Sequence, residues 1–404
     1  MTDTITPPEV SKAPGYQHQT LLVGEEIYLR RIEKGDAQLT TSWRESFVPH
    51  APSTTETWIT ETIAKGKTSW FAIIRKADDR IVGSLQITGG MTGSYVEAYV
   101  DPLFSAAGRW KAEAVRLVVP WEVDEKERMR CLITLASDDV EMIAALTELG
   151  AWEATRSPGY LNRGTSRADL VRFAYLNRDW VAKLGDPREV PIERTGTGEP
   201  RPVPARGSWT GDPPKNAIAV GERVYLKPVD KADAEAVARW SRRETETYGV
   251  TRSVKSPAYM VGDRMGEQKD AWPSDIGFAV YLRENDTFIG EVALLHVDYL
   301  NRFAETASWM SDPAYRGNGY GFEAKHLLLE YAFETVGLLG VESFVAAGNT
   351  RSAAALRKQG YREVGVSPWA SLRNGTFGNT LIFNLTADAW RALPRAAATA
   401  EDAS

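Results

Sequence analysis

The chain of 404 residues exceeds one ordinary hydrophobic core and is long enough for two domains. Its 43% hydrophobic and 25% charged residues are typical of a soluble globular protein. The formal net charge of −6 disfavours nucleic-acid binding and suits a cationic partner.

Other features of the composition narrow the class of protein further. Apolar runs stay short of membrane-spanning length, and residues 1–20 lack a signal-peptide core. The single Cys131 excludes an internal disulfide, and the four histidines include no metal-ligand pair. We therefore expect a cytoplasmic protein without a membrane segment or a metal site.

The first half of the chain predicts a domain at residues 20–184, after a frayed tail that ends near Gln19. A first strand is expected from Tyr28, and a strand pair at residues 71–74 and 81–87 is expected to turn at residues 77–79. Residues 185–217 are rich in Pro, Gly and charge without apolar periodicity, which predicts an irregular, extended linker.

The second half predicts a domain at residues 218–393, followed by a second frayed tail at residues 394–404. Its expected elements are, in chain order, a strand from Tyr225, a strand pair at 278–282 and 288–295 turning at 284–286, a strand at 304–310, a helix at 322–335, a strand at 341–346 and a helix from near Thr350. Strands mixed with helices predict an α/β or α+β domain.

The two halves echo one another. Residues 23–30 match residues 220–227 in pattern, and Asp101-Pro102 matches Asp312-Pro313. We infer a tandem duplication with about a dozen extra residues in the second copy. The extra residues fall between Trp240 and Phe278 and are rich in aromatic and acidic side chains that suit a cationic amine.

A glycine-rich segment lies between the strand at 304–310 and the helix at 322–335. Glycines at a strand-to-helix junction let backbone N–H groups turn toward an anion at the helix N-terminus. The spacing differs from that of the dinucleotide fingerprint and of the P-loop. We predict a pyrophosphate cradle formed by Gly317, Asn318, Gly319, Tyr320, Gly321 and Phe322.

Three motifs in order resemble the GNAT superfamily of N-acetyltransferases, in its branch of ribosomal-protein N-terminal acetyltransferases. Arg316, Gly319 and Gly321 match its Arg-x-x-Gly-x-Gly loop, residues 304–310 resemble its fourth strand, and residues 349–361 resemble its Asn-x-x-Ser…Gly-Phe segment. The resemblance implies acetyl-coenzyme A as co-substrate and no metal. Together with the inferred duplication, it implies that each of the two tandem domains is a mixed, mostly antiparallel sheet flanked by helices.

The resemblance also implies roles for single residues near the cofactor. Strand residues Trp309, Met310 and Ser311 are expected along the pantetheine arm, with Asn349 as a further cofactor contact. Arg316 pairs with a phosphate in this interpretation, and is a solvated surface arginine in the alternative.

The expected catalytic residues are a base and donors to the leaving thiolate. Glu305 is the first candidate for the base, with a structural strand carboxylate as the alternative, and His296 is the second candidate. Leu356 takes the place where many relatives have a tyrosine acid, so Asn349 and Ser352 are the remaining donors. Ser352 is equally compatible with a helix N-cap role.

The first copy lacks most of this chemistry. Residues 105–110 replace the glycine-rich turn, and we align Trp110 with Gly321 and Asp139 with Asn349. We interpret the first copy as degenerate, although Arg109 leaves an altered cofactor site open.

Three functions remain. The first is an acetyl-coenzyme A-dependent N-acetyltransferase on a small cationic amine or on a protein or peptide α-amine. Neutralising a lysine-like amine at pH 7 costs about 4.6 kcal/mol and an α-amine about 1–1.4 kcal/mol, so only the former needs a strong base. The others are a non-catalytic acyl-coenzyme A binding or sensing protein and a scaffold. An oligomer remains possible.

Overall fold

The computed structural model describes residues 20–38, 43, 50–63, 68–90, 92–190, 198–243, 271–310, 313–373 and 375–397. The chain divides into two compact units, Met1–Glu153 with Leu170–Gly185 and Ala154–Asp169 with Asp186–Ser404. These bounds differ from the predicted domains in two places, because segment 154–169 and residues 186–217 both belong to the second unit.

The sheet of the first unit is antiparallel except for one parallel pair, β5 with β6. Its strand order is β1-β2-β3-β4-β5-β6-β8. The strands are β1 (Thr20–Val23), β2 (Ile27–Arg31), β3 (Thr68–Arg75), β4 (Arg80–Gly89), β5 (Gly93–Val100), β6 (Arg130–Ala136) and β8 (Arg167–Leu176).

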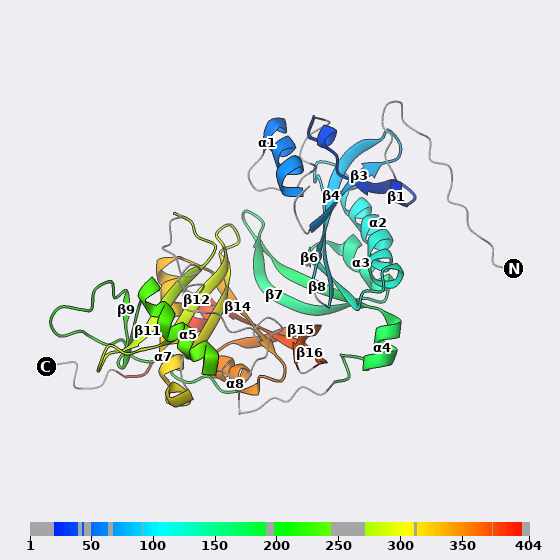
Figure 1. Ribbon diagram of the computed structural model, residues 1–404. Coiled ribbons are helices and arrows are strands. Elements are labelled where there is room, and N and C mark those ends of the chain that lie inside the picture. The colour runs from blue at the N-terminus through cyan, green and yellow to red at the C-terminus, as the bar shows by residue number, and fades with distance from the viewer. Residues whose placement is uncertain are drawn as a thin grey trace. The chain divides into compact units, whose positions relative to one another are not determined.

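Helices cover both faces of this sheet (Figure 1). On one face, α2 (Ala107–Pro120), which continues into a π-helical turn, and α3 (Val140–Glu148) pack on side chains such as Leu29 and Ile73. On the other face, the π-helical turn after α1 (Pro52–Thr57) packs on Ile74 and Ile81. The unit ends with α4 (Arg178–Leu184).

The second unit has the same kind of sheet, antiparallel except for the parallel pair β13 with β14. Its order is β9-β10-β11-β12-β13-β14-β16-β15, and β7 (Trp152–Asn162) pairs with β15 where Thr155 faces Gly365. The other strands are β9 (Ala219–Val220), β10 (Val224–Pro228), β11 (Ile276–Leu282), β12 (Phe288–Asp298), β13 (Phe303–Met310), β14 (Gly340–Ala346), β15 (Arg362–Arg373) and β16 (Thr376–Thr386).

The main core of the second unit lies between one face of this sheet and two helices, α7 (Tyr320–Glu330) and α8 (Thr350–Lys358). Like α2, α7 continues into a π-helical turn, Tyr331–Thr335. The remaining helices are α5 (Ala234–Arg243) and α9 (Ala387–Arg391). The order of elements along the chain is therefore similar in the two units.

Parts of the predicted linker and tail are fixed on the second unit. Val203 is 5% exposed, forms a β-bridge with Arg395 and belongs to the core under α7 and α8. The amide of Arg201 donates to the carbonyl of Lys358 at 2.8 Å. The prediction of a frayed tail is wrong for residues 394–397, because their backbone bonds to Val203 hold them in place.

The predicted fold class is confirmed, since each unit combines a mixed, mostly antiparallel sheet with packed helices. The predicted hairpin turns are also confirmed, with Asp79 and Asp286 in the left-handed backbone region at φ 54° and 53°. The predicted acidic and aromatic insertion falls almost entirely in residues 244–270, outside the described residues.

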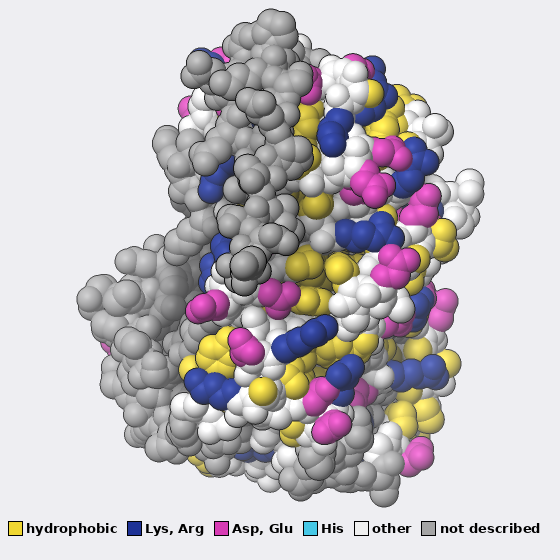
Figure 2. Space-filling view, turned by 90° about the vertical axis from the view of Figure 1, so that its right-hand side faces the viewer, with side chains coloured by type: hydrophobic (Ala, Val, Ile, Leu, Met, Phe, Trp, Pro, Cys, Tyr) yellow, Lys and Arg dark blue, Asp and Glu magenta, His cyan; other side chains and the backbone are white. Residues whose placement is uncertain are grey.

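The described surface has no strongly charged face in the view of Figure 2. There, Lys and Arg side chains alternate with Asp and Glu side chains, in agreement with the modest net charge of −6. None of the described helices combines the length and the apolar character that a membrane crossing needs.

Candidate active site

The glycine-rich turn forms a strand-to-helix junction with an open helix N-terminus. Gly317 and Gly319 have φ angles of 82° and 86°, a region that disfavours other residues, and Gly319 is the N-cap of α7. The first helical hydrogen bond runs from the Glu323 amide to the Gly319 carbonyl at 3.0 Å. The amides of the preceding first turn are thus available to an anion, which the helix dipole also favours. The turn fits the pyrophosphate group that was predicted for it.

Side chains around the turn hold its shape. The Asn318 side-chain amide donates to the Ala314 carbonyl at 2.9 Å, and Arg316 Nη2 lies 3.3 Å from the Met310 carbonyl oxygen. Arg223, which sequence reasoning missed, donates to the Asn318 carbonyl at 2.8 Å and stacks over the Tyr320 ring. The turn is therefore preorganised by local contacts.

The other predicted cofactor residues have different surroundings. Trp309 Nε1 donates to Glu291 Oε2 at 2.8 Å, while Met310 is partly buried against the core under α7. The Phe322 ring packs on His326 with the ring centres 4.6 Å apart. Ser311 lies outside the described residues.

A buried glutamate anchors the first turn of α7 to the sheet. Glu323 is 1% exposed and accepts hydrogen bonds from the amides of Arg223 at 2.8 Å and Val224 at 3.2 Å. In the first unit, Glu113 accepts in the same way from the amides of Glu26 and Ile27. The two glutamates therefore mark equivalent positions in α2 and α7.

The two anchoring glutamates allow the starts of α2 and α7 to be compared. The first helical bond of α2 runs from the Trp110 amide to the Ala106 carbonyl at 3.0 Å. Counted from the anchoring glutamate, α2 thus begins about one turn earlier than α7. An additional helical turn replaces the glycine turn, and its formation ties up backbone amides that remain open in the second unit.

The predicted alignment of Trp110 with Gly321 is wrong by one residue. The anchors pair Trp110 with Tyr320, and Lys111 with Gly321. Lys111 forms an ion pair with Asp139, the N-cap of α3, so its side chain joins the starts of the two helices. At the position that corresponds to Gly321, the first unit therefore has the Lys111 side chain, where the second unit has no side chain.

The packing of the helices also differs between the two units. In the first unit α2 packs along α3, whereas in the second unit α7 and α8 share few close backbone contacts.

Glu305 lies in β13 at the point where this strand pairs with β14. Its side chain is 26% exposed, and Oε2 is 4.0 Å from Nε2 of His296, whose own side chain is 78% exposed. Burial raises the pKa of Glu305, and the negative charges of Glu342 and Asp275 add to the increase. The structure thus brings both candidate bases together, and Glu305 has the environment of a base that works nearer neutral pH than an ordinary carboxyl group.

Two charged residues beside Glu305 were missed by the sequence reasoning. Lys325 of α7 is 1% exposed, and its positive charge opposes the increase in the pKa of Glu305. Glu342 of β14 is 4% exposed and is the strand-register partner of Glu305. Lys325 lies on the buried face of a helix, and Glu342 lies within a short buried strand. A charged residue in such an apolar pattern was the sequence signal that could have identified both.

The predicted thiolate donors lie at the start of α8. Asn349 is the N-cap, and its side-chain oxygen accepts from the Ser352 amide at 3.3 Å. Leu356 is 5% exposed in the core. The hydroxyl of Tyr361 is 2.8 Å from Oγ1 of Thr306, which is next to Glu305 in β13. The sequence did not single out this phenol as a donor.

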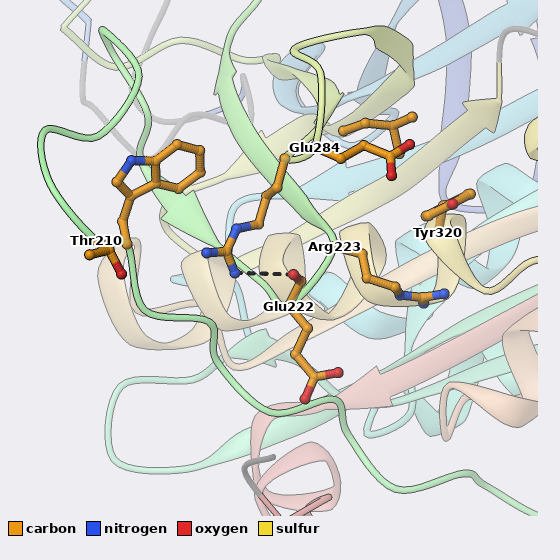
Figure 3. A pocket seen from close by; sticks show the side chains of 8 residues that line it. Thr210, Glu222, Arg223, Glu284 and Tyr320 are labelled. Atoms are coloured by element: carbon orange, nitrogen blue, oxygen red, sulfur yellow. Dashed lines mark hydrogen bonds between the residues drawn. The ribbon is translucent and has the colours of Figure 1, made fainter. Parts of the chain in front are cut away.

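A cavity of about 480 Å³ lies next to the glycine turn (Figure 3). Thr210 lies across it from Tyr320 and Arg223. Arg283, the second arginine that lines the cavity, donates to the carbonyls of Gly221 and Ser208. Because both guanidinium groups already bond to the protein, we assign no ligand to this cavity. No group of metal-binding side chains occurs in the part of the chain that the structure describes.

Comparisons with known proteins find similarity over part of the chain. Residues 223–362 match the model of the acetyltransferase (GNAT) domain family. The chain is 24% identical over 155 residues to "Probable N-acetyltransferase YjcK" of Bacillus subtilis (strain 168), covering 36% of this chain and 84% of that protein.

Solved structures give matches of similar extent. One, described as "Probable acetyltransferase", is 23% identical and covers 43% of this chain and 98% of its own, with a TM-score of 0.38. A chimera of the Vibrio cholerae spermidine N-acetyltransferase SpeG and hSSAT is 18% identical and covers 42% and 98%, with a TM-score of 0.36. Residues 223–362 are thus similar to acetyltransferase domains of the GNAT type.

Proposed function

We propose that the second unit transfers an acetyl group from acetyl-coenzyme A to a primary amine, and that the first unit binds no cofactor. The open amides at the α7 N-terminus carry the proposal, because the matching turn of the first unit is closed by helix and by Lys111. We also retain the ribosomal-protein N-terminal acetyltransferase branch and the tandem duplication as proposals. The shared order of elements and the matched anchors Glu113 and Glu323 support the duplication.

The thioester supplies the activated acetyl group, and the protein supplies binding and proton transfer. Glu305 accepts a proton from the substrate ammonium, the neutral nitrogen forms a bond to the acetyl carbon, and the C–S bond breaks. The nitrogen then loses a second proton, and the leaving sulfur takes one up. Asn349 and Ser352 at the start of α8 remain the proposed donors near that sulfur.

The acceptor that we propose is a cationic amine. The three carboxylates of Glu305, Glu342 and Asp275 outnumber the two nearby cationic groups, Lys325 and His296. A net negative site attracts an ammonium group and stabilises it before deprotonation. A protein or peptide α-amine is the alternative acceptor, because its lower pKa needs less help from a base.

The test is an amine panel assayed by release of free thiol, with Glu305→Gln and His296→Gln beside the wild type. We expect a diamine or amino sugar to react best and Glu305→Gln to reduce kcat/KM by about 10²–10⁴-fold. A larger loss in His296→Gln would transfer the base role to that residue. Binding of acetyl-coenzyme A without thiol release from any amine would favour a non-catalytic binding protein.

A further inference from the structure

Segment 154–169 precedes the linker in the sequence but belongs to the second unit, where it contacts the start of β13. The Asn162 amide donates to Asn301 Oδ1 at 2.8 Å, and Arg167 Nη2 lies 2.5 Å from the Asn301 carbonyl oxygen. The Tyr160 ring stacks on Phe303, with ring centres 4.4 Å apart. The segment is thus attached two residues before Glu305.

One buried side chain of this segment reaches the charged residues around Glu305. Ser157 is 0% exposed, and its hydroxyl donates to Oε1 of Glu342. Glu342 faces Glu305 in the register of the parallel pair β13–β14. A hydroxyl from the first half of the sequence therefore contacts the carboxylate next to the proposed base.

Four charged residues from different parts of the second unit act on the pKa of Glu305. Glu342 of β14 and Asp275, just before β11, raise the pKa of Glu305. His296 of β12 and Lys325 of α7 lower it. Among these groups, Glu342 is the one that a hydroxyl of segment 154–169 contacts.

We propose that Ser157 is a positioning residue for acetyl transfer, which holds the Glu342 carboxylate beside Glu305. The inference rests on the function proposed above. The hydrogen bond keeps a negative charge at a fixed place in a poorly screened interior, where a small displacement changes its effect on a neighbour. Segment 154–169 is then part of the active site, and the second unit requires it for a correctly tuned base.

The first experiment compares the pH dependence of kcat/KM in four variants. Glu342→Gln removes the neighbouring charge, and Ser157→Ala frees the carboxylate to turn away. Both are expected to move the acid limb to lower pH, by about 0.5–1 unit in Glu342→Gln and by less in Ser157→Ala. Ser157→Thr keeps the hydroxyl, so its acid limb should lie at the same pH as in the wild type. Ser367→Ala, which removes another buried serine hydroxyl of the second unit, should behave in the same way.

The second experiment needs no activity. The titration of Glu305 is followed by carboxyl ¹³C NMR of the glutamate-labelled full chain, with its resonance identified by its loss in Glu305→Gln. A lower titration midpoint of Glu305 in Ser157→Ala and Glu342→Gln than in the wild type supports the inference, even if no amine is acetylated. An unchanged midpoint in folded Ser157→Ala overturns it, even if the enzyme is active. Should Ser157→Ala not fold, Ser157→Cys, with its weaker donor, carries the same test.

Discussion

Lys325, which acts on the proposed base Glu305, is a buried lysine with an unusual environment. Burial lowers its pKa to about 7 from 10.5, although the charge of Glu305 acts in the opposite direction. Between these two values the unfolded chain holds a proton that the folded chain has lost. Folding is therefore penalised most below pH 7, and the penalty decreases as the pH rises toward 10.5.

Replacing Lys325 by Met should stabilise the protein while it impairs catalysis. We expect a gain of at least about 1 kcal/mol in the free energy of unfolding at pH 6 that decreases as the pH rises from 7 toward 10.5, because methionine has no charge to desolvate. Urea unfolding at several pH values measures it. The exposed Lys215→Met is the control and should change little. A loss of stability at pH 6 in Lys325→Met would show that the ammonium group is paired well enough to stabilise the fold.

At the scale of elements, the proposed cofactor site lies at the junction between β13 and α7. The strand, the helix and the glycine turn between them were predictable, because each has a local pattern: apolar alternation, helical periodicity and glycine at left-handed backbone positions. The contacts that hold the junction were not, since Glu323 and Arg223 are about a hundred residues apart in sequence. Nor was the assignment of segment 154–169 to the second unit, which only the tertiary contacts of residues such as Ser157 reveal.

Gly321 offers a graded test of the space beside the turn. A Cβ atom there would lie 3.6 Å from Met310 Cγ, an ordinary contact, so Gly321→Ala should fold normally and weaken acetyl-coenzyme A binding only slightly. Gly321→Trp should abolish binding, because a bulky side chain at this position obstructs the approach of the cofactor to the backbone amides. Titration calorimetry distinguishes the two. Tight binding by folded Gly321→Trp is incompatible with a pyrophosphate at this turn.

The two anchoring glutamates form a matched pair of variants. Glu323→Ala leaves the buried amides of Arg223 and Val224 unpaired, which should cost about 1–3 kcal/mol in unfolding free energy, and it should also weaken cofactor binding. Glu113→Ala disrupts the equivalent anchor in the first unit, at a more exposed side chain, and should leave cofactor affinity unchanged. Denaturation and calorimetry measure the two effects. Equal losses of affinity in both variants would argue against a cofactor site confined to the second unit.

At the scale of the whole molecule, the two units share the same kind of sheet and a similar order of helices, and they differ at the junction before α2 and α7. The second unit keeps a glycine turn with an open helix N-terminus and a half-buried glutamate. The first unit has a longer α2 and the Lys111–Asp139 ion pair instead. The proposed chemistry therefore belongs to the second unit, and Ser157 from the first half of the sequence contacts Glu342 next to the proposed base.

The stoichiometry of cofactor binding tests this account most directly. Titration of the full chain with acetyl-coenzyme A should show one site per chain, since the amides of the α7 first turn are open and those of α2 are closed. Two equivalent sites per chain, or one site that survives Gly321→Trp, would contradict it.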